Sequence, residues 1–570
     1  MASPLTRRQI VLLVILATAT LPYVVGLGDS SLWDANEAFY AETPREMLES
    51  GDYINPTFNY QPRFNKPVLP YWVVAIFYHG LDVSERTERL PIALGALVLV
   101  ATAFGLGRLI GSLDAGLLAA IVIATSPQFL MLARRIIIDV HLAMFAGLTL
   151  WFFALADAHP GRKRRYLMLM YLAAALGTLT KGPVAVFVPG LVFLIYLMWE
   201  RRLADVRRMM VPAGVIIGAI VVLPWYVLLY RQHGWVHIES FVVGENLLRF
   251  AQTVGAADRG PLFYVPVMLG FLFPWSLFLP FALWPVRRQA LPKPTLRADD
   301  LAERGRRDRE GHTAAGSQRT TRLLVLWVGV FVLFFSLSST KQDLYILPIM
   351  PAAAALVGGL LARGFNSPCP ESRRLRWVMV VTGVLLLVVG AGLLGLFVAP
   401  GQYPLAGVAT ASVVTVLAGL SAVALGGKKK LFAAATVVSM SLAVVSWCVV
   451  VATLPDFERY KPVRPLARAI EARASTDAVI GYYKAAFPSM VFYLQRPVLE
   501  LVGPRQLSEA FSSSTDVYML MTANDYRATR ETLPVRTYVI DRRPWFDVTL
   551  GNVLAGTALP EVLLVSNRPP

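Results

Sequence analysis

The sequence predicts an all-helical membrane domain with about thirteen transmembrane helices, followed by a small soluble α/β domain at the C-terminus. Hydrophobic residues make up 56% of the 570 residues and charged residues only 16%, and the mean hydropathy is +0.54. Long apolar runs recur as far as residue 453 and then stop. This composition is typical of a polytopic membrane protein and excludes an ordinary soluble globular chain.

The apolar runs have roughly the 17 to 25 residues that a helix needs to cross a hydrocarbon core of ~30 Å. The expected spans centre on residues 10–28, 88–110, 113–131, 136–157, 165–180, 183–199, 210–230, 262–285, 322–338, 343–362, 376–398, 404–425 and 431–453. Residues 1–453 are therefore the predicted membrane domain, and residues 454–570 are the second domain.

The basic residues predict the orientation of the chain. Arg and Lys clusters occur in alternate connections, at residues 7–8, 162–165, 201–202, 286–321, 373–374 and 428–430. By the positive-inside rule these connections and the N-terminus are cytoplasmic, and residues 454–570 lie outside. The net charge of +17 thus reflects topology rather than nucleic-acid binding. The stretch 286–321 lacks apolar periodicity, so we expect a flexible cytoplasmic loop there.

The outer C-terminal domain is expected to mix helices and strands. Residues 462–474 have the apolar spacing of an amphipathic helix, and residues 478–483, 490–494, 516–521 and 535–540 are short apolar runs typical of strands. No nucleophile, metal or phosphate-loop pattern occurs in this domain, so we expect it to be structural or to cover a substrate.

The first outer loop, residues 29–87, contains helix signals next to the membrane. Asp34 and Glu37, and likewise Thr43 and Glu46, have the spacing of a capping box, and Gly51 suits a helix end. These signals predict two short surface helices. A third helix is expected to begin near residue 67 and to carry interfacial aromatic side chains.

Ionisable side chains collect on the predicted outer face, although the spans themselves are almost free of charge. They are Asp34, Glu37, Glu42, Arg45, Arg63 and Lys66 in the first loop, and Arg134, Asp139, Lys181, Arg249 and Lys341 at later outer positions. Basic residues in outer loops run against the positive-inside rule. They indicate an anion held at headgroup depth, and a lipid phosphate is the simplest such ligand.

Carboxylates beside a phosphate site fit group-transfer chemistry. A carboxylate would deprotonate an acceptor hydroxyl, the hydroxyl oxygen would attack an anomeric carbon, and cations would stabilise the departing lipid phosphate. The sequence has no ATP-binding motif, and nucleotide sugars are absent outside the cell, so the donor would be linked to a lipid.

Other roles for these residues stay open. Asp34 and Glu37 equally suit helix caps, Lys66 suits an interfacial anchor, and Asp139 suits an ion-pair partner of a nearby arginine. A membrane transporter or lipid flippase is the rival function. Such proteins tend to place ionisable residues near mid-membrane in repeated halves, whereas here the polar residues gather at one face.

Three motifs resemble those of the C-type membrane glycosyltransferases. They are the stretch 36–47, which reads NEAFYAETPREM and is followed by RFNKPVLPYW at 63–72, the TKGP turn at 180–183, and the FSLS…K…YILP stretch at 335–348. The similar group is the bacterial one that contains the lipid A aminoarabinose transferase and relatives of the protein O-mannosyltransferases. The resemblance covers most of the membrane domain.

This resemblance implies an inverting transferase in the bacterial inner membrane, with its C-terminal domain in the periplasm. It would move a sugar from a polyprenyl phosphate to lipid A or lipopolysaccharide, to another glycan or to a protein. By motif position Lys66, Arg249 and Tyr345 would hold the lipid phosphate, and Asp139 would be the second acidic residue. The family usually has aspartate where this chain has Asn36, so either Asp34 or Glu37 must serve as the base.

The remaining expectations concern neighbouring residues and partners. Lys341 and Arg63 are further candidates for the lipid phosphate, and the wider set of site candidates is Asn36, Glu42, Arg45, Arg134 and Lys181. No metal-ligand set is predicted, although a divalent cation stays possible. We expect a monomer that contacts membrane lipids and binds no nucleic acid.

Overall fold

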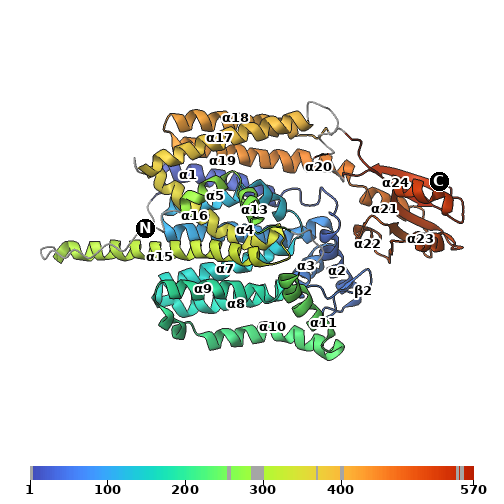
Figure 1. The fold of residues 1–570 in the computed structure, drawn as a ribbon, viewed down its shortest axis with the longest axis horizontal. Helices are drawn as coiled ribbons and strands as arrows, with labels where there is room; N and C mark the ends of the chain where they lie inside the picture. Colours follow the sequence, from blue (N-terminus) through green and yellow to red (C-terminus); the bar gives the residue numbers. More distant parts are fainter. Residues whose placement is uncertain are drawn as a thin grey trace.

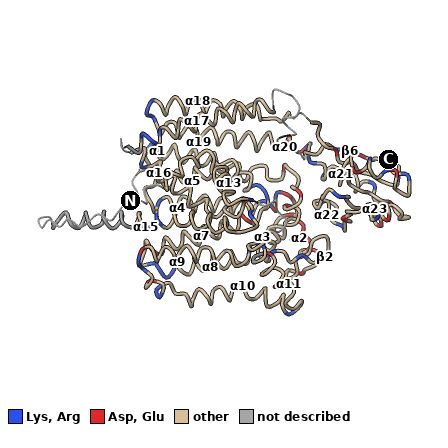
Figure 2. The backbone as a smooth tube through the Cα atoms, in the orientation of Figure 1, with Lys and Arg blue, Asp and Glu red and all other residues tan. Residues whose placement is uncertain are grey.

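A bundle of long helices carries a small sheet domain at one end (Figure 1). This computed structural model describes residues 4–252, 259–283, 301–366, 370–397, 404–546, 551 and 557–569. The sheet domain contains the C-terminus, and it adjoins the helix ends where the first outer loop lies. Figure 2 shows that Lys and Arg also gather at the opposite end of the bundle, as the alternation of basic connections predicts.

Each expected span contains a helix or a pair of helices. They are α1 (Arg7–Thr20), α4 (Glu85–Ile110), α5 (Leu113–Ala124), α6 (Pro127–Ala133), α7 (Ile138–Ala158), α8 (Lys163–Lys181), α9 (Val184–Trp199), α10 (Val211–His233), α13 (Tyr264–Phe271), α14 (Leu279–Leu283), α15 (Leu301–Leu337), α16 (Met350–Asn366), α17 (Pro370–Phe397), α18 (Val408–Gly427) and α19 (Leu431–Cys448).

The described helices that are long enough to cross a membrane are fewer than the thirteen spans predicted from the sequence. Eight of the described helices are long and apolar enough to cross a membrane, and ten if each of two bent pairs counts as one span. One bent pair is α5 with α6, which meet at 71°, and the other joins α13 to the helical segment 275–283 at 114°. The figure of thirteen therefore stays a prediction, whereas a multi-pass helical membrane domain is observed.

Small residues allow the central helices to pack closely. Helix α5 is buried along its whole length and contacts α1, α4 and α16. A Cβ atom at Gly358 of α16 would lie 2.4 Å from the Ala119 backbone nitrogen of α5, so only glycine fits at that crossing. Close backbone approach at small residues is how helices associate in membranes, where the surrounding lipid is as apolar as the side chains.

The expected flexible loop at 286–321 is wrong over its second half. Residues 301–321 form the first part of α15, while residues 284–300 lie outside the described part of the chain. Residues 301–310 read LAERGRRDRE, in which Leu, Ala, Glu and Arg are strong helix formers. Intrinsic propensity therefore outweighs the missing apolar periodicity.

The first outer loop forms one helix where two were expected. Helix α2 spans Asn36–Ser50 and includes Pro44, and its N-terminal Ala35 provides no side-chain cap. Arg45 bridges to Glu42 and Glu49 on successive turns, which stabilises the helix beyond the proline. Gly51 ends it at φ +71°, as predicted. The hairpin β1 (Thr57–Phe58) and β2 (Gln61–Pro62) follows, and then the expected third helix, α3 (Leu69–Gly80).

The C-terminal domain is a five-stranded sheet in the order β4-β3-β5-β7-β6, with helices packed against it. Strand β3 pairs in parallel with β4 and β5, and β7 runs antiparallel to β5 and β6. The elements are α21 (Val463–Glu471), β3 (Val479–Tyr483), α22 (Ser489–Leu494), β4 (Leu499–Leu501), α23 (Pro504–Phe511), β5 (Val517–Thr522), α24 (Ala523–Thr529), β6 (Tyr538–Pro544) and β7 (Glu561–Ser566).

The expected helix at 462–474 and the strands at 478–483 and 516–521 are confirmed as α21, β3 and β5. The run 535–540 overlaps β6, which begins at Tyr538. The expected strand at 490–494 is wrong, because these residues form α22, which packs against both α2 and α21. A fully buried apolar run has no period that separates strand from helix, and Pro488 at the start of α22 favours the helix.

Candidate active site

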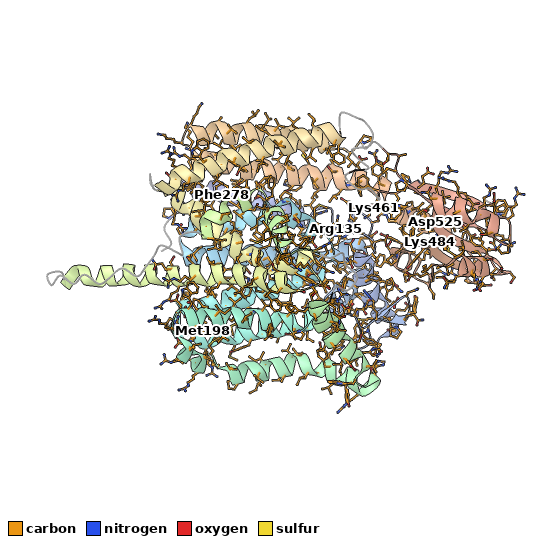
Figure 3. The ribbon with its side chains drawn as sticks, viewed as in Figure 1. Arg135, Met198, Phe278, Lys461, Lys484 and Asp525 are labelled. Carbon is orange, nitrogen blue, oxygen red and sulfur yellow. The ribbon has the colours of Figure 1, made fainter. Side chains whose placement is uncertain are left out.

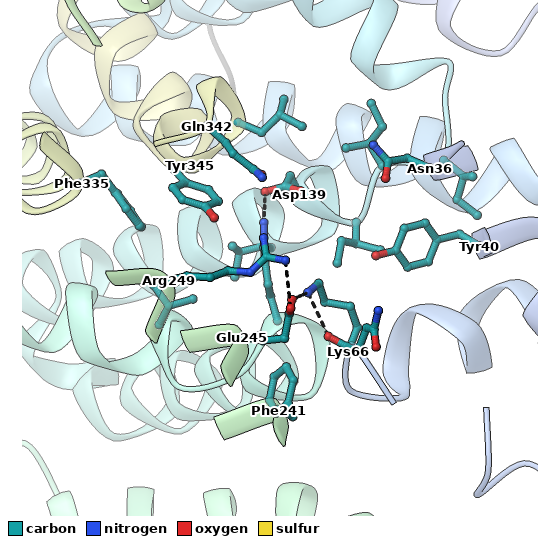
Figure 4. Close-up of a pocket in the computed structure, with 18 of the residues that line it drawn as sticks. Asn36, Tyr40, Lys66, Asp139, Phe241, Glu245, Arg249, Phe335, Gln342 and Tyr345 are labelled. Atoms are coloured by element: carbon teal, nitrogen blue, oxygen red, sulfur yellow. Dashed lines mark hydrogen bonds and ion pairs between the residues drawn. The ribbon is translucent and has the colours of Figure 1, made fainter. Parts of the chain in front are cut away.

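A cavity of about 750 Å³ lies between the first outer loop and the ends of α7 and α8, and Figure 4 shows residues that line it. Its wall comes from the start of α2, from residues 63–66, from the start of α7 and the end of α8, from the segment 241–250 and from residues 334–345. Nine of the predicted site residues line it: Asp34, Asn36, Glu37, Arg63, Lys66, Asp139, Lys181, Arg249 and Tyr345. Segments far apart in sequence thus place their polar side chains around one space.

One carboxylate bridges two cations on one side of the cavity. Glu245 forms ion pairs with Lys66 and with Arg249, and its distance to the Arg249 Nη2 is 2.9 Å (Figure 4). Burial lowers the pKa of Lys66, although Glu245 opposes that change. Burial disfavours ionisation of Glu245, but Lys66 and Arg249 hold its pKa below the ordinary value. Two positive charges sharing one negative charge leave this side of the cavity cationic.

A second ion pair lines the cavity beside the Lys66, Glu245 and Arg249 cluster. Asp139, in the first turn of α7, pairs with Lys181 at the end of α8. The Lys181 ammonium lies 5.2 Å from the ring centroid of Tyr345, in cation–π contact. Asp139 is thus oriented by a cation and faces the cavity next to the Lys66 and Arg249 cluster.

Glu37 is buried and fully bonded. Arg89 of α4 donates two hydrogen bonds to its carboxylate, both at 2.9 Å, and the backbone N–H groups of Trp33 and Ile136 donate two more, at 2.7 and 3.1 Å. Burial disfavours the charge, but Arg89 and these donors hold the pKa of Glu37 below its ordinary value. This carboxylate ties α2 to α4 and to the start of α7, which is the work of an anchor rather than of a base.

Asp34 has the opposite character. It is exposed to the cavity, and its two oxygens accept hydrogen bonds from Ser489 in the C-terminal domain, at 2.8 Å from the backbone N–H and at 2.9 Å from the hydroxyl. Desolvation by the surrounding protein disfavours the charged carboxylate and raises the pKa of Asp34 to about 6, although Ser489 and Lys461 oppose that change. A carboxylate with a pKa near neutrality suits proton transfer. It is not the N-cap that its spacing suggested.

Two arginines contribute positive charge without a carboxylate partner among the described residues. Arg63 lies 3.9 Å from the ring centroid of Phe39, and Arg135 lies 3.8 Å from that of Trp33. The Nε atom of each is buried without a hydrogen-bond partner in the described part of the chain. Both line the cavity, so an anionic group bound there would find two donors available.

Four predicted site residues lie elsewhere. Glu42 and Arg45 pair with each other in a separate cluster on α2, at 2.7 Å. Arg134 donates to the backbone carbonyls of Val25 and Gly26, at 2.6 and 2.7 Å, and so holds the end of the first span. The Lys341 ammonium is buried and donates to the Ser338 carbonyl at 2.7 Å, outside the cavity lining.

Glu245 and Arg135 belong to the polar residues of the predicted outer face but were not among the predicted site residues, and Ser489 was not identified at all. Glu245 stands four residues before Arg249, an ion-pair spacing on a helix, which was a usable signal. Ser489 gave none, because its contact with Asp34 joins positions 455 residues apart. The described residues contain no group of three His, Cys, Asp or Glu side chains able to hold a metal ion.

Comparison with known proteins shows which families and folds this chain resembles. Residues 65–228 match the family of the dolichyl-phosphate-mannose-protein mannosyltransferases. The chain is 30% identical over 406 residues to an undecaprenyl phosphate-alpha-4-amino-4-deoxy-L-arabinose arabinosyl transferase 1 of Pseudomonas fluorescens, covering 69% of this chain and 65% of that protein. It is 28% identical to transferase 2 of another strain of that species, covering 60% of this chain and 58% of the relative.

The chain thus matches somewhat less than two thirds of the length of both transferases. The crystal structure of ArnT from Cupriavidus metallidurans bound to undecaprenyl phosphate superposes with a TM-score of 0.77, at 21% identity and over 98% of each chain. Its fold is therefore shared across the bundle and the C-terminal domain. Residues 65–228 thus match a mannosyltransferase family and the whole chain shares the fold of ArnT, in agreement with the resemblance first drawn from its outer loops.

Proposed function

We propose that this protein transfers a sugar from an undecaprenyl-phosphate donor to a hydroxyl group of an acceptor, with inversion at the anomeric carbon. The observation that carries the proposal is the shared cavity, in which a cationic cluster at Lys66 and Arg249 faces the carboxylates of Asp34 and Asp139. Phosphate binding and proton transfer need these two kinds of group within one space. The relatives named above act on undecaprenyl-phosphate aminoarabinose, and none of them is named a transporter.

The donor phosphate would replace the carboxylate of Glu245 between Lys66 and Arg249. Both are anions of similar size, so the phosphate would inherit donors that are already aimed at one point. The hydroxyl of Tyr345 is a further donor at this side of the cavity. Phe187, Phe250, Phe334 and Phe335 also line the cavity, and these rings would cover the first isoprene units of the lipid.

The acceptor would react on the side of Asp34. Its hydroxyl proton passes to the Asp34 carboxylate while the oxygen attacks the anomeric carbon. The bond from that carbon to the phosphate oxygen breaks, its electron pair stays on the phosphate, and undecaprenyl phosphate leaves. Asp139 faces the developing charge on the sugar. Asn36, in the position where the family usually has aspartate, lines the cavity and offers a neutral amide in place of a base.

The acceptor candidates are lipid A or lipopolysaccharide, another glycan, and a protein. Arg63 and Arg135 favour one that carries an anionic group beside its reactive hydroxyl, because both guanidinium groups reach the cavity without a carboxylate partner among the described residues. A phosphorylated glycolipid such as lipid A has that chemistry. Basic connections at the far end of the bundle (Figure 2) support a cytoplasmic N-terminus and a periplasmic cavity in the bacterial inner membrane.

The test is a turnover assay with the purified full-length protein. The donor is undecaprenyl phosphate-4-amino-4-deoxy-L-arabinose, the acceptors are lipid A and a peptide with serine and threonine, and released undecaprenyl phosphate is measured. We expect acceptor-dependent release that falls about 10²- to 10⁴-fold in Asp34→Asn, the usual size of a general-base contribution. Glu37→Gln should instead lower the yield of folded protein. Folded wild-type protein that releases nothing with either acceptor would contradict the proposal.

A further inference from the structure

Residues 30–34 reach the cavity without regular secondary structure of their own. Their backbone is held by side chains of the C-terminal segment. Glu458 accepts from the Ser31 N–H at 2.9 Å, and the Tyr493 hydroxyl accepts from the Leu32 N–H at 2.7 Å. The Lys461 ammonium donates to the Ser30 hydroxyl at 3.1 Å and to the Ser31 carbonyl. Three residues of the C-terminal segment, more than 400 positions away, thus help to hold this stretch, together with Arg89 of α4 and Glu37 of α2.

Trp33 is clamped in the same way. Its indole stacks on Phe457 with centroids 5.5 Å apart, and the Lys461 ammonium lies 4.3 Å from the indole centroid. The guanidinium of Arg135 also contacts this ring. Figure 3 shows Lys461 and Arg135 at the junction between the helical bundle and the sheet domain. Trp33 lines the cavity beside Asp34, so the C-terminal segment shapes the cavity wall as well as the loop.

Ser489 completes the arrangement at Asp34 itself. It is fully buried at the start of α22, and α22 packs against α2. Both its backbone N–H and its hydroxyl bind the Asp34 carboxylate. Two donors from one fixed residue define the direction of both carboxylate oxygens, while each oxygen keeps a second lone pair for an acceptor proton.

We propose that the C-terminal domain positions the base of the transfer reaction, with Ser489 orienting the Asp34 carboxylate and Lys461 fixing the loop that carries it. This inference rests on the proposed role of Asp34. It gives the domain a part in catalysis although it supplies no group that touches the substrate. Ser489 and Lys461 are positioning residues in this arrangement.

The charges around Asp34 predict how the two residues act. Lys461 and Ser489 stabilise the ionised carboxylate from the C-terminal side, and the charge of Glu37 on α2 opposes ionisation. Burial lowers the pKa of Lys461 itself to about 7, against the attraction of Glu37. Removing the Ser489 hydroxyl or the Lys461 charge therefore raises the pKa of Asp34. Because the base acts only when ionised, the acidic limb of the pH–rate profile then moves to higher pH.

The experiment measures turnover of undecaprenyl phosphate-4-amino-4-deoxy-L-arabinose with lipid A from pH 5 to pH 9 for Ser489→Ala, Ser489→Thr and Lys461→Met. We expect kcat of Ser489→Ala to fall about tenfold at pH 6 and less at pH 8, since a hydrogen bond to a charged group is lost. KM for the donor should stay within about twofold, because the phosphate site at Lys66 and Arg249 is untouched. Ser489→Thr should restore most of the activity.

Ser512→Ala is the matched control, since its hydroxyl is exposed and, within the described part of the chain, bonds at 2.9 Å to the Ser508 carbonyl of its own helix end. Binding of undecaprenyl phosphate by each variant shows that it is folded. An unshifted pH profile in a folded Ser489→Ala protein would overturn the inference and leave the transferase proposal intact. Absence of turnover in wild-type protein at every pH would instead remove both.

Discussion

Two ion clusters in the outer loops differ in their charge balance. On α2, Arg45 is shared among Glu42, Glu49 and the hydroxyl of Tyr60, so its positive charge meets more than one negative charge. Facing the cavity, Glu245 alone is shared by Lys66 and Arg249. Both clusters pair glutamates with basic side chains, and the sequence placed members of both in the candidate site.

The comparison shows what separates a structural network from a ligand site. A cluster in which acids outnumber bases holds its cation and needs no further anion. A cluster in which two bases share one acid, at the wall of a cavity, retains the capacity to bind another anion. Residue type and nearness to the membrane do not distinguish the two, but charge balance and access to a cavity do.

The largest expected effect breaks the cationic cluster. Lys66→Ala combined with Arg249→Ala should lower the affinity for undecaprenyl phosphate by about 3–6 kcal/mol, because each residue contributes a charge-assisted bond of about 1.5–3 kcal/mol. Binding is measured with the protein in nanodiscs at constant ionic strength. Arg45→Met is the matched control, since it removes a cation from the other cluster. Equal loss of affinity in both proteins would refute the distinction between the clusters.

The same Arg45→Met variant should instead destabilise the fold, by about 3 kcal/mol, since it leaves the buried Glu42 without its partner. Burial already raises the pKa of Glu42 to about 7. Because the pKa of Glu42 is higher in the folded protein than in the unfolded chain, protonation of Glu42 favours the folded state. The free energy of unfolding therefore falls as pH rises from about 4.5 through the folded pKa. The loss should thus be greater at pH 8 than at pH 6, as thermal unfolding in detergent measures. A loss independent of pH would show that Glu42 does not titrate.

A smaller effect follows from Glu245. Its carboxylate occupies the place between Lys66 and Arg249 where the donor phosphate would bind, so Glu245→Gln should remove a competing charge. We expect the affinity for undecaprenyl phosphate to rise about 3- to 10-fold, or ~0.7–1.4 kcal/mol. Weaker binding by the variant would mean that Glu245 mainly organises the two cations. Glu239→Gln serves as the control, since Glu239 ends the helical turn 236–239 just before the cavity-lining segment 241–250.

How far the sequence predicts this molecule depends on the range of the interaction. Helix positions follow from local hydropathy, so α4, α7 and α10 appear close to where they were expected. Nine predicted site residues meet at the cavity because outer helix ends must lie at one face of a membrane bundle. The separate roles of Asp34 and Glu37 were not predictable, because they depend on Arg89 and Ser489, which are distant in the sequence.

Two of the wrong predictions also concern interactions with residues that are distant in the sequence. A capping-box spacing assigned Asp34 to a helix end, but the carboxylate binds a residue of another domain instead. The apolar run 490–494 has no clear period and suggests a strand, but its packing between α2 and α21 favours a helix. Local patterns therefore place the elements, while the partner of each polar side chain is set by tertiary structure.

The smallest expected effect concerns Lys341, which the sequence grouped with the phosphate ligands. Its ammonium donates to the Ser338 carbonyl within its own turn and does not line the cavity. Lys341→Met should leave the affinity for undecaprenyl phosphate within about twofold of wild type, because an ammonium turned away from the ligand contributes only a screened charge. Lys66→Met, measured beside it, should show a loss of at least tenfold. A loss of that size in Lys341→Met would place its amine at the phosphate, and would require the turn 338–341 to rearrange when the donor binds.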